Sequence, residues 1–488
     1  MARSRTESVL VWFRHDLRLA DHAALTAAAK TGLAVIPVFV GGPEGEAIGA
    51  CRAASRWWLH RSLQQLDGSL QARESRLIVR QGPATEALLR LALETRARRI
   101  FCHSVYEPEP MAFAARLAER LAEHGIRLEC FNGSLLFAPG EIRTAAGGCF
   151  RVFTPFWNAM WRMRDGLRSP LPAPNTLRAP ARWPRSLPVE ALGLEPRIDW
   201  AAGLRTTWKP GEAEARRQLR AFARGPVRSY GQLRDRTDAT ATSRLSPHLH
   251  FGEISPVQVW SAAAAASGAE PYLRQLAWRE FAYHVLCAHP ESQQEPLQVE
   301  FRRFPWRRNV RQLHAWQQGR TGYPFVDAGM RELWATGWMH NRARLVTASF
   351  LVKHLLQPWQ EGAAWFLDTL VDADLANNTM GWQWVAGCGV DAAPYFRIFN
   401  PVLQGKKFDP RGDCVRRWVP ELRRLPARWI HQPWAAPPAV LAEAGVQLGV
   451  DYPRPIVDAA HGRRAALAAY AVMRRAKAGT TRRSTAGR

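Results

Sequence analysis

The sequence has no apolar run of 18 residues, and its opening, MARSRTES, is too short and too polar to begin a signal peptide. Neither a membrane-spanning helix nor an exported protein is therefore expected. Its seven cysteines are scattered, without CxxC pairs or metal-ligand spacing, which argues against a disulfide framework and against a metal site. We expect a soluble, intracellular protein of a reducing compartment that binds no metal.

The motif GxGxxG does not follow the first apolar run, so a dinucleotide at that position is not supported. Up to about Phe131, five short apolar runs alternate with helical stretches, a pattern typical of a Rossmann-like five-stranded parallel sheet with helices on both faces. Beyond a Pro-rich stretch over 168–208 that cannot sustain helices, helical periodicity predicts helices over 212–224, 256–266, 272–287, 326–356 and 363–370. We predict an α/β domain over 6–135, a Pro-rich linker over 136–208, a larger all-α domain over 209–475 and a basic disordered tail over 476–488.

Acidic side chains are in the minority, with 42 Asp and Glu against 67 Lys and Arg, which gives a formal net charge of +25. Such an excess favours a polyanionic partner or an anionic surface, although an Arg-rich proteome with evenly spread charge would give the same total. The 21 tryptophans are more informative, because indole faces stack on unpaired bases.

One largely uncharged stretch, DADLANNTMGWQWVAGCGVDAAPYFRIFNP over 372–401, combines carboxylates, amides, tryptophans and an arginine. Asp372 and Asp374 could anchor a polar ligand or pair with arginines, and Trp382 and Trp384 supply polarizable faces. A Trp-rich core segment is the alternative, but so many polar groups are costly to bury without partners. In TSRLSPHLHFGEIS, hydroxyls and one guanidinium precede a helix start, which suits either a pyrophosphate or simple helix capping.

Motifs over nearly the whole chain resemble those of the DNA photolyase and cryptochrome family, and most of all bacterial class I cyclobutane pyrimidine dimer photolyases. They are VWFRHDLRLADHAAL, TSRLSPHLHFGEIS, WREFAYH, GWMHNRARLVTASFLVKHLL and the segment 372–401. The resemblance implies an FAD-binding helical domain and light-driven DNA repair, in which an electron from excited reduced FAD splits a flipped-out dimer.

The resemblance also implies roles for individual residues. It assigns to FAD binding Tyr230, Thr242, Ser243, Arg244, Leu245, Ser246, Arg279, Asn341, Arg344, Asp372, Asp374 and Asn378. Among these, Arg344 and Asp372 would flank the isoalloxazine and Asn378 would face flavin N5. Trp306, Trp359 and Trp382 occupy the positions of the electron-transfer tryptophans, which sequence alone would place in the core. These three, with Asn378 and Gln275, form the expected catalytic set.

The resemblance assigns to the lesion and its flanking phosphates Arg234, Gln275, Trp278, Arg342, Leu345, Trp384 and Arg397. Trp278 and Trp384 would form two walls of the lesion cavity, although from the residues alone Trp278 would be a core residue. Gln275 stands where dimer photolyases usually have Glu, and Leu345 stands where Met is usual. A blue-light receptor of the cryptochrome type is therefore the alternative to a photolyase, and a non-photochemical nucleic-acid binder is a third hypothesis.

Family members carry an antenna chromophore on the N-terminal domain, either a folate or a deazaflavin. Glu109 and Pro110 stand where folate-binding members have an Asn-Glu pair, so the antenna is left open. His248 and His250 alternate without further ligands nearby, which favours a structural role over a metal site. We expect a cytoplasmic, nucleoid-associated monomer that acts on UV-damaged DNA and needs no obligate protein partner.

Overall fold

The computed structural model describes residues 7–42, 52–391 and 396–485, with side chains described up to 475. Contacts divide the chain into two compact units. The first contains Met1–Gly231, Thr242–Pro290 and Val371–Ala376, and the second contains Gln232–Ala241, Glu291–Leu370 and Asn377–Arg488. Helices α9 (Pro226–Leu233) and α17 (Leu375–Ala386) have residues in both units.

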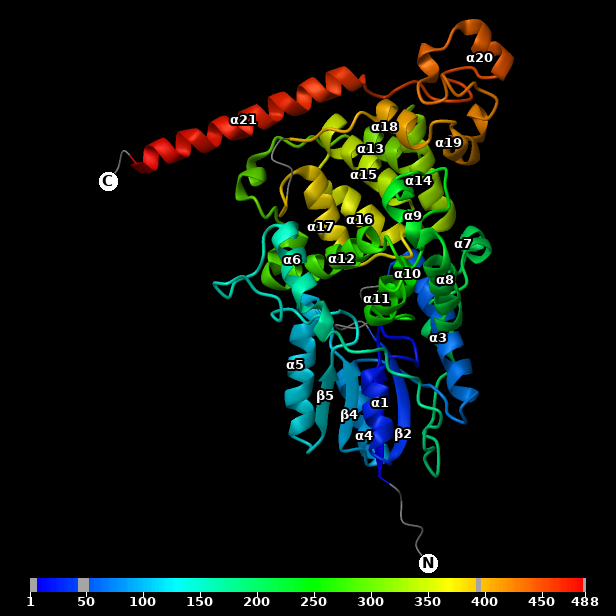
Figure 1. Ribbon diagram of the computed structural model, residues 1–488, viewed down its shortest axis with the longest axis vertical. Coiled ribbons are helices and arrows are strands. Elements are labelled where there is room, and N and C mark those ends of the chain that lie inside the picture. The colour runs from blue at the N-terminus through cyan, green and yellow to red at the C-terminus, as the bar shows by residue number, and fades with distance from the viewer. Residues whose placement is uncertain (1–6, 43–51, 392–395, 486–488) are drawn as a thin grey trace, which may run out of the picture. The chain divides into compact units, whose positions relative to one another are not determined.

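The first unit contains a parallel sheet in the strand order β3-β2-β1-β4-β5 (Figure 1). The strands are β1 (Ser8–Phe13), β2 (Ala34–Gly41), β3 (Ile78–Gln81), β4 (Arg99–His103) and β5 (Arg127–Phe131). Strands β1 and β2 are buried along their whole length, as a parallel sheet covered on both faces requires. The predicted five-stranded Rossmann-like sheet is confirmed.

Helices cover the sheet and bury its side chains. They are α1 (Ala23–Lys30), α3 (Ala53–Gln71), α4 (Ala84–Thr95) and α5 (Pro108–Ala122). Leu88 of α4 and Leu117 of α5 pack with Leu10 and Ile100 in one core cluster. Because side chains alternate along a strand, the neighbours of Leu10 point to the other face, and α1 packs against β1, β4 and β5 there.

The remaining helices of the first unit follow the sheet in sequence. They are α6 (Phe153–Met163), α7 (Ala202–Thr207), α8 (Glu212–Arg224), α10 (Ser246–His250), α11 (Pro256–Ala264) and α12 (Glu270–Ala288). The stretch 168–208, for which the prolines predict no sustained helix, contains only the 3₁₀ turn Val189–Leu192 and the six-residue α7. Helices α8, α11 and α12 of the first unit begin within two residues of the positions that the periodicity predicts.

Helices joined by loops make up the described part of the second unit, apart from one isolated bridge between Leu448 and Tyr452. Its helices are α13 (Val310–Gln317), α14 (Pro324–Thr336), α15 (Asn341–Ser349), α16 (Trp359–Thr369), α18 (Pro401–Phe408), α19 (Asp413–Trp418), α20 (Pro438–Ala444) and α21 (Ala459–Thr485). Short 3₁₀ segments also occur. Arg164–Gly166 lies in the first unit, Pro290–Gln293 has residues in both units, and Val299–Arg303, Pro420–Leu422 and Pro433–Ala435 lie in the second unit. A second core cluster, which includes Val415, Leu422, Ile430 and Tyr452, lies in this unit.

One helical prediction was wrong in its extent. The stretch 326–356 was expected to be a single helix, but α14 ends before Gly337, whose φ of +66° is the left-handed conformation that stops a helix. Helix α15 then passes into a π-helical turn over Phe350–His354. Periodicity continues through such a break because the apolar spacing on both sides remains helical.

The last helix continues to Thr485, into the stretch predicted to be a disordered tail. The run AALAAYAVMRRAKA over 465–478 is rich in Ala and Arg, which have high helix propensity, and it carries the helix into the first residues of that stretch. Over the residues that the structure describes, no helix is both long and apolar enough to cross a bilayer.

Candidate functional site

Asp374 lies at the start of α17 and is tied to α12 by a buried hydrogen bond. The Tyr283 hydroxyl donates to Asp374 Oδ2 at 2.6 Å, and Asp372 and Asp374 are only 8% and 6% exposed. One turn before Tyr283, the Arg279 guanidinium lies 5.2 Å from the Tyr283 ring centre and donates to the Ser134 carbonyl at 2.7 Å. The structure thus brings together two of the predicted flavin-binding residues of the first unit, Asp374 and Arg279.

The charges near Asp374 limit how many carboxylates can ionise there. Burial raises the pKa of Glu107 to about 7, and the negative charge of Asp374 adds to the effect. Burial also raises the pKa of the Tyr283 hydroxyl well above its usual value, so it stays a hydrogen-bond donor. Near neutral pH, Glu107 is therefore only about half ionised.

The predicted phosphate-binding stretch surrounds Tyr272 of α12. Its hydroxyl lies 3.1 Å from Ser243 Oγ, and the Tyr230 ring meets the Tyr272 ring edge-on at 5.2 Å. Arg244 has a φ of +52°, which is unusual for a residue with a side chain, and its guanidinium lies 4.4 Å from the Trp208 ring centre. Strained backbone next to hydroxyls and a cation is more typical of a ligand-binding turn than of plain helix capping.

In the second unit, Asn378 and Arg344 are held by backbone carbonyls. Asn378 Nδ2 donates to the Ala363 carbonyl at 3.1 Å, which fixes the amide so that its oxygen points away from that contact. Arg344 Nε donates to the Met339 carbonyl at 2.8 Å. Asn341 begins α15 and is exposed, whereas Leu345 one turn later is half-buried.

The predicted lesion contacts on α12 are half-buried rather than part of the core. The Trp278 ring stacks on the Phe153 ring at 3.7 Å with an interplanar angle of 8°. Gln275, one turn earlier, is also half-buried, and its Nε2 donates to the Pro271 carbonyl at 3.4 Å. The interpretation of Trp278 as a fully buried core residue is therefore wrong, because one face is taken by Phe153 while part of the side chain is accessible.

The predicted phosphate contacts of the second unit are not all equally available. Arg342 Nη2 pairs with Asp235 at 2.6 Å, and its guanidinium lies 4.4 Å from the Phe408 ring centre. Arg234 lies 3.8 Å from the same carboxylate. Arg342 would have to give up Asp235 to bind a phosphate.

Arg397 and Trp384 lie together in the second unit. The Arg397 guanidinium is 5.6 Å from the Trp384 ring centre, so a cation lies near an indole face. Trp384 is half-buried.

The three predicted electron-transfer tryptophans differ in depth. Trp359 and Trp382 are 1% and 2% exposed, whereas Trp306 is half-buried and packs on Phe304 at 4.4 Å. The Trp382 ring also meets Trp316 at 6.1 Å, a fully buried indole that the sequence analysis did not select. A relay needs one partner near the surface, and Trp306 meets that condition.

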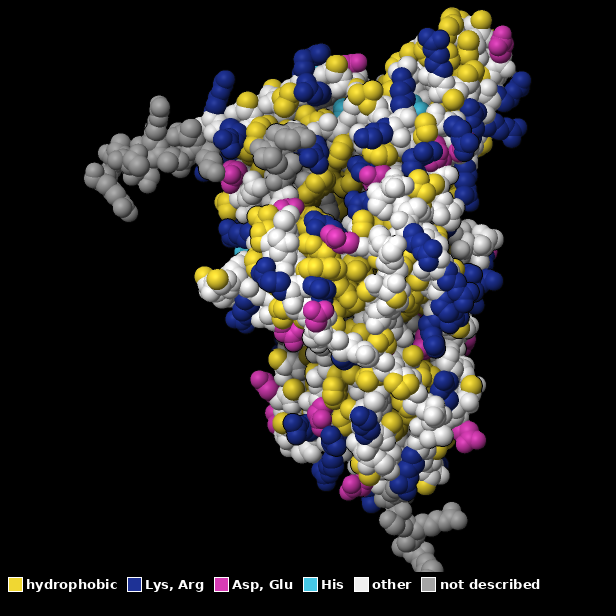
Figure 2. All heavy atoms as spheres, in the orientation of Figure 1, with side chains coloured by type: hydrophobic (Ala, Val, Ile, Leu, Met, Phe, Trp, Pro, Cys, Tyr) yellow, Lys and Arg dark blue, Asp and Glu magenta, His cyan; other side chains and the backbone are white. Residues whose placement is uncertain are grey.

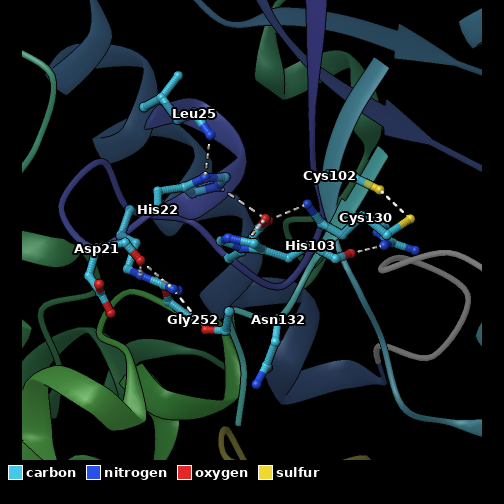
Figure 3. Close-up of polar contacts among 12 residues, drawn as sticks. Asp21, His22, Leu25, Cys102, His103, Cys130, Asn132 and Gly252 are labelled. Carbon is cyan, nitrogen blue, oxygen red and sulfur yellow. Dashed lines mark hydrogen bonds and ion pairs between the residues drawn. The ribbon is translucent and has the colours of Figure 1, made fainter. Parts of the chain in front are cut away.

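A separate polar cluster lies at the carboxyl edge of the sheet (Figure 3). Asp16 Oδ2 is 3.1 Å from His22 Nε2 and 3.0 Å from His103 Nδ1, a spacing that could hold a metal ion. The Leu25 amide, however, donates to His22 Nδ1 at 3.0 Å, so in a neutral ring the proton resides on Nε2 and points at Asp16. The cluster is therefore better described as a carboxylate held between two imidazoles.

Burial shapes the ionisation of this cluster. It lowers the pKa of His103 to about 3, with the neighbouring His22 contributing. Burial opposes ionisation of Asp16, but contacts with His103 and His22 outweigh it and keep the pKa of that carboxyl well below its usual value. His248, predicted to be structural, is fully buried and pairs with Glu253.

Comparisons with known proteins agree with these observations. The family model described as the FAD binding domain of DNA photolyase matches residues 272–472, and the model described as DNA photolyase matches residues 9–175. The chain belongs to the DNA photolyase and cryptochrome family. The resemblance inferred from the motifs is thereby confirmed, together with an FAD-binding domain.

The relatives of this photolyase and cryptochrome family member cover almost its whole length. The deoxyribodipyrimidine photo-lyase of Agrobacterium fabrum is 45% identical over 478 residues, which are 96% of this chain and 99% of the relative. Cryptochrome-1 of Arabidopsis thaliana is 41% identical, over 92% of this chain and 68% of the relative. The crystal structure of a bacterial class III photolyase from Agrobacterium tumefaciens has a TM-score of 0.94 at 45% identity, over 97% of this chain and 99% of that one. That relative is a class III photolyase, so the class I resemblance of the motifs stays a prediction.

The sequence analysis missed partners rather than motifs. Tyr283 lies within the quoted motif WREFAYH and Tyr272 begins the predicted helix, yet neither was selected because tyrosine in a buried helix is usually a packing residue. Both present a hydroxyl to a predicted site residue. A buried hydroxyl needs a hydrogen-bond partner, which is the signal that could have identified them.

Proposed function

We propose that this protein repairs UV-damaged DNA in the light as a deoxyribodipyrimidine photo-lyase and that its substrate is the cyclobutane pyrimidine dimer. The observation that carries the proposal is the 45% identity to a protein of that name, which spans both chains almost completely. Several of the predicted site residues also make defined hydrogen bonds, which supports the proposal that this chain has kept the activity of that relative. Bacterial relatives of this kind favour a cytoplasmic protein.

FAD fits the donor set that the chain offers. Thr242, Ser243 and Arg244 supply hydroxyls and a guanidinium to phosphates, with Tyr230, Leu245 and Ser246 completing that stretch. Arg279, Asn341, Arg344, Asp372, Asp374 and Asn378 are the proposed contacts of the isoalloxazine and its surroundings. The strained Arg244 backbone supports this assignment, because a positive φ at a residue with a side chain is costly and is typical of functional turns. The Tyr283 hydroxyl, which donates to Asp374, holds that carboxylate in one position.

The chain's own residues position and protect rather than perform acid–base chemistry. Reduced FAD, when bound, supplies the light-excited electron that splits the dimer. Asn378, with its nitrogen committed to the Ala363 carbonyl, presents an amide oxygen that cannot change charge. Trp382, Trp359 and Trp306 are the proposed relay that delivers an electron from the surface to the flavin.

The lesion is proposed to lie between indole faces. Trp278 already stacks on Phe153 and keeps an accessible part, and Trp384 lies beside the cationic Arg397. Gln275 offers an amide to the flipped base, and Leu345 an apolar contact. A dimer stacks poorly in duplex DNA, so flipping it costs less than flipping a normal pair.

Phosphates of the damaged strand are proposed to bind Arg234, Arg342 and Arg397, which makes binding salt-dependent and independent of sequence. Lys and Arg side chains also gather over α8 on the face that Figure 2 shows. Four arginines of that helix, Arg216, Arg217, Arg220 and Arg224, are exposed. Such a surface would raise the rate of encounter with DNA.

The runner-up function is a cryptochrome-type blue-light receptor that binds FAD and repairs little. It is favoured by Gln275 at a position where dimer photolyases usually carry Glu, and by 41% identity to a plant cryptochrome. A second antenna chromophore, a folate or a deazaflavin-like molecule, is compatible with either function.

The test is repair of a defined cyclobutane thymine dimer by the FAD-loaded, reduced protein under blue light. A (6-4) lesion and a dark reaction serve as controls. We expect the cyclobutane dimer to disappear only in the light. If bound FAD photoreduces normally but neither lesion is lost, the repair hypothesis fails and the receptor remains.

A matched pair of variants tests the lesion site. Trp278→Ala is expected to reduce affinity for dimer-containing DNA about 5- to 150-fold, since one base–indole stack contributes about 1–3 kcal/mol. Trp200→Ala removes another indole of the same unit that is 42% exposed, and should leave affinity unchanged. Equal losses in both variants would contradict a specific role for Trp278.

A further inference from the structure

Two cysteines lie side by side on neighbouring strands of the sheet. Cys102 of β4 and Cys130 of β5 are register partners, and their sulfur atoms are 3.4 Å apart (Figure 3). Parallel neighbours have Cα atoms about 4.8 Å apart, within the range of about 4.4–6.8 Å that disulfides span. A small change in the two side-chain torsions would therefore bring the sulfurs to bonding distance.

The two thiols differ in access. Cys102 is fully buried in the core cluster of the sheet, whereas Cys130 is exposed on the edge strand β5. The hydrogen bond from Cys102, aided by the cation of Arg14, lowers the pKa of Cys130 to about 7, although burial acts in the opposite direction. Contact with Cys130, together with burial, raises the pKa of Cys102 well above its usual value. One surface thiolate with a buried thiol behind it is the arrangement of an attacking and a resolving cysteine.

We propose that Cys130 and Cys102 form a redox-active dithiol site that accepts low-molecular-weight disulfides such as oxidised glutathione. The Cys130 thiolate attacks one sulfur of the small disulfide, forms a mixed disulfide and releases one thiolate. Cys102 then loses its proton and attacks the Cys130 sulfur, which releases the second thiolate. The protein dithiol loses two electrons and two protons, and the small disulfide is reduced to two thiols.

The new bond would join β4 and β5 one residue before both strands end. His103, which follows Cys102, packs its ring so closely on Gly133 that a Cβ there would lie 2.5 Å from three ring atoms. Arg14 donates to the His103 carbonyl, so the same cation that lies near the thiols also holds this strand end. Formation of the disulfide would therefore change the positions of residues at the carboxyl edge of the sheet, where ligands of parallel sheets bind.

The experiment uses the FAD-loaded protein in the dark, incubated with oxidised glutathione, alkylated, digested with trypsin and analysed by mass spectrometry. Cys102 and Cys130 fall in separate peptides, 100–116 and 128–143, each with a single cysteine. We expect these two peptides to become joined by a disulfide that a reductant removes. The initial rate should be half-maximal near pH 7. A mixed disulfide that persists on Cys130 without any joined peptide would overturn the proposal.

Two serine variants separate the roles. In Cys102→Ser, glutathione should accumulate on Cys130, because the resolving thiol is absent. In Cys130→Ser, Cys102 should stay reduced, because it is buried. Cys149 is the internal control, since burial raises the pKa of its thiol, and it should react slowly in every protein. The proposal fails if Cys149 reacts as fast as Cys130, or if Cys102 reacts with glutathione in Cys130→Ser. An unchanged absorption spectrum of the bound flavin checks that each variant is folded.

Discussion

Replacing Gly362 with alanine should disturb the proposed electron relay at one defined point. Gly362 lies in α16, directly beneath the Trp382 ring. A Cβ at this position would lie 2.5 Å from Cζ3 and 2.6 Å from Cζ2 of that indole. An ordinary carbon–carbon contact is about 3.5 Å, and Cη2 of the indole would lie closer still, so the ring or the helix must move by more than about 1 Å.

Neither partner can move freely. Trp382 is 2% exposed and is bounded by Phe366 at 5.0 Å and Trp316 at 6.1 Å between ring centres. Overpacking of this kind costs about 1–3 kcal/mol, while alanine in place of glycine within a helix returns about 1 kcal/mol. The free energy of unfolding should therefore fall by no more than about 2 kcal/mol. The displaced indole should slow light-driven reduction of oxidised FAD.

Two measurements separate relay from repair. The first is the rate of FAD photoreduction with an external electron donor, which should fall in Gly362→Ala. The second is dimer repair by protein whose FAD has been reduced chemically in the dark, which should be nearly unchanged because repair does not need the relay. Gly68→Ala is the control, since a Cβ at that helical position meets nothing within 4 Å. Wild-type photoreduction in a variant with the expected loss of stability would refute the role of Trp382.

Three further predictions follow from the contacts. Asp235→Ala should free Arg342 for phosphate, so that affinity for DNA rises and the slope of log binding constant against log salt concentration steepens by about one. Arg342→Ala should make that slope shallower. Equal slopes in titrations at several salt concentrations would contradict this. Asp327→Ala should lower the free energy of unfolding by about 3–5 kcal/mol in chemical denaturation, because a buried carboxylate accepts from Thr321, Gly322 and Tyr452; a loss below 1 kcal/mol would count against it. The free energy of unfolding should also fall as the pH drops from about 6.5 to 4. Burial lowers the pKa of four histidines to about 4, so over this range the same side chains bind protons in the unfolded chain but not in the folded one. These histidines are His284, His340, His354 and His431. A free energy of unfolding that does not change with pH over this range would contradict the prediction.

The centre of the sheet could be predicted from sequence because β1 and β2 are buried along their whole length. SVLVWF and AVIPVFV have no polar residue to interrupt them, so they cannot form a half-exposed strand or an amphipathic helix. The break at Gly337 could not be predicted from hydrophobic periodicity, because the apolar spacing of α14 and α15 continues across it. A backbone angle, rather than a hydrophobic pattern, ends that helix.

The sequence predicts site residues that stand together in one segment, but it does not reveal the partners that the fold brings to them. Asp374 is conspicuous in its own segment, but its partner Tyr283 lies 91 positions away. The cysteine pair shows what a combined argument could have found. Cys is the fourth residue both in RIFC and in RLEC, so two adjacent strands in register would place the thiols side by side. The pattern was visible, but the adjacency of the strands was needed to interpret it.

Charge placement connects the fold to the proposed chemistry. A reduced flavin anion is disfavoured by every ionised carboxylate near it. Two features of the chain would limit such charges at the proposed flavin site. One is the neutral amide of Asn378, and the other is Glu107, whose pKa burial raises to about 7, with Asp374 contributing. The Tyr283 hydroxyl donates a hydrogen bond to Asp374. Sequence alone supplied the amide, but the state of Glu107 depends on its desolvation and on the nearness of Asp374, which only the folded chain determines.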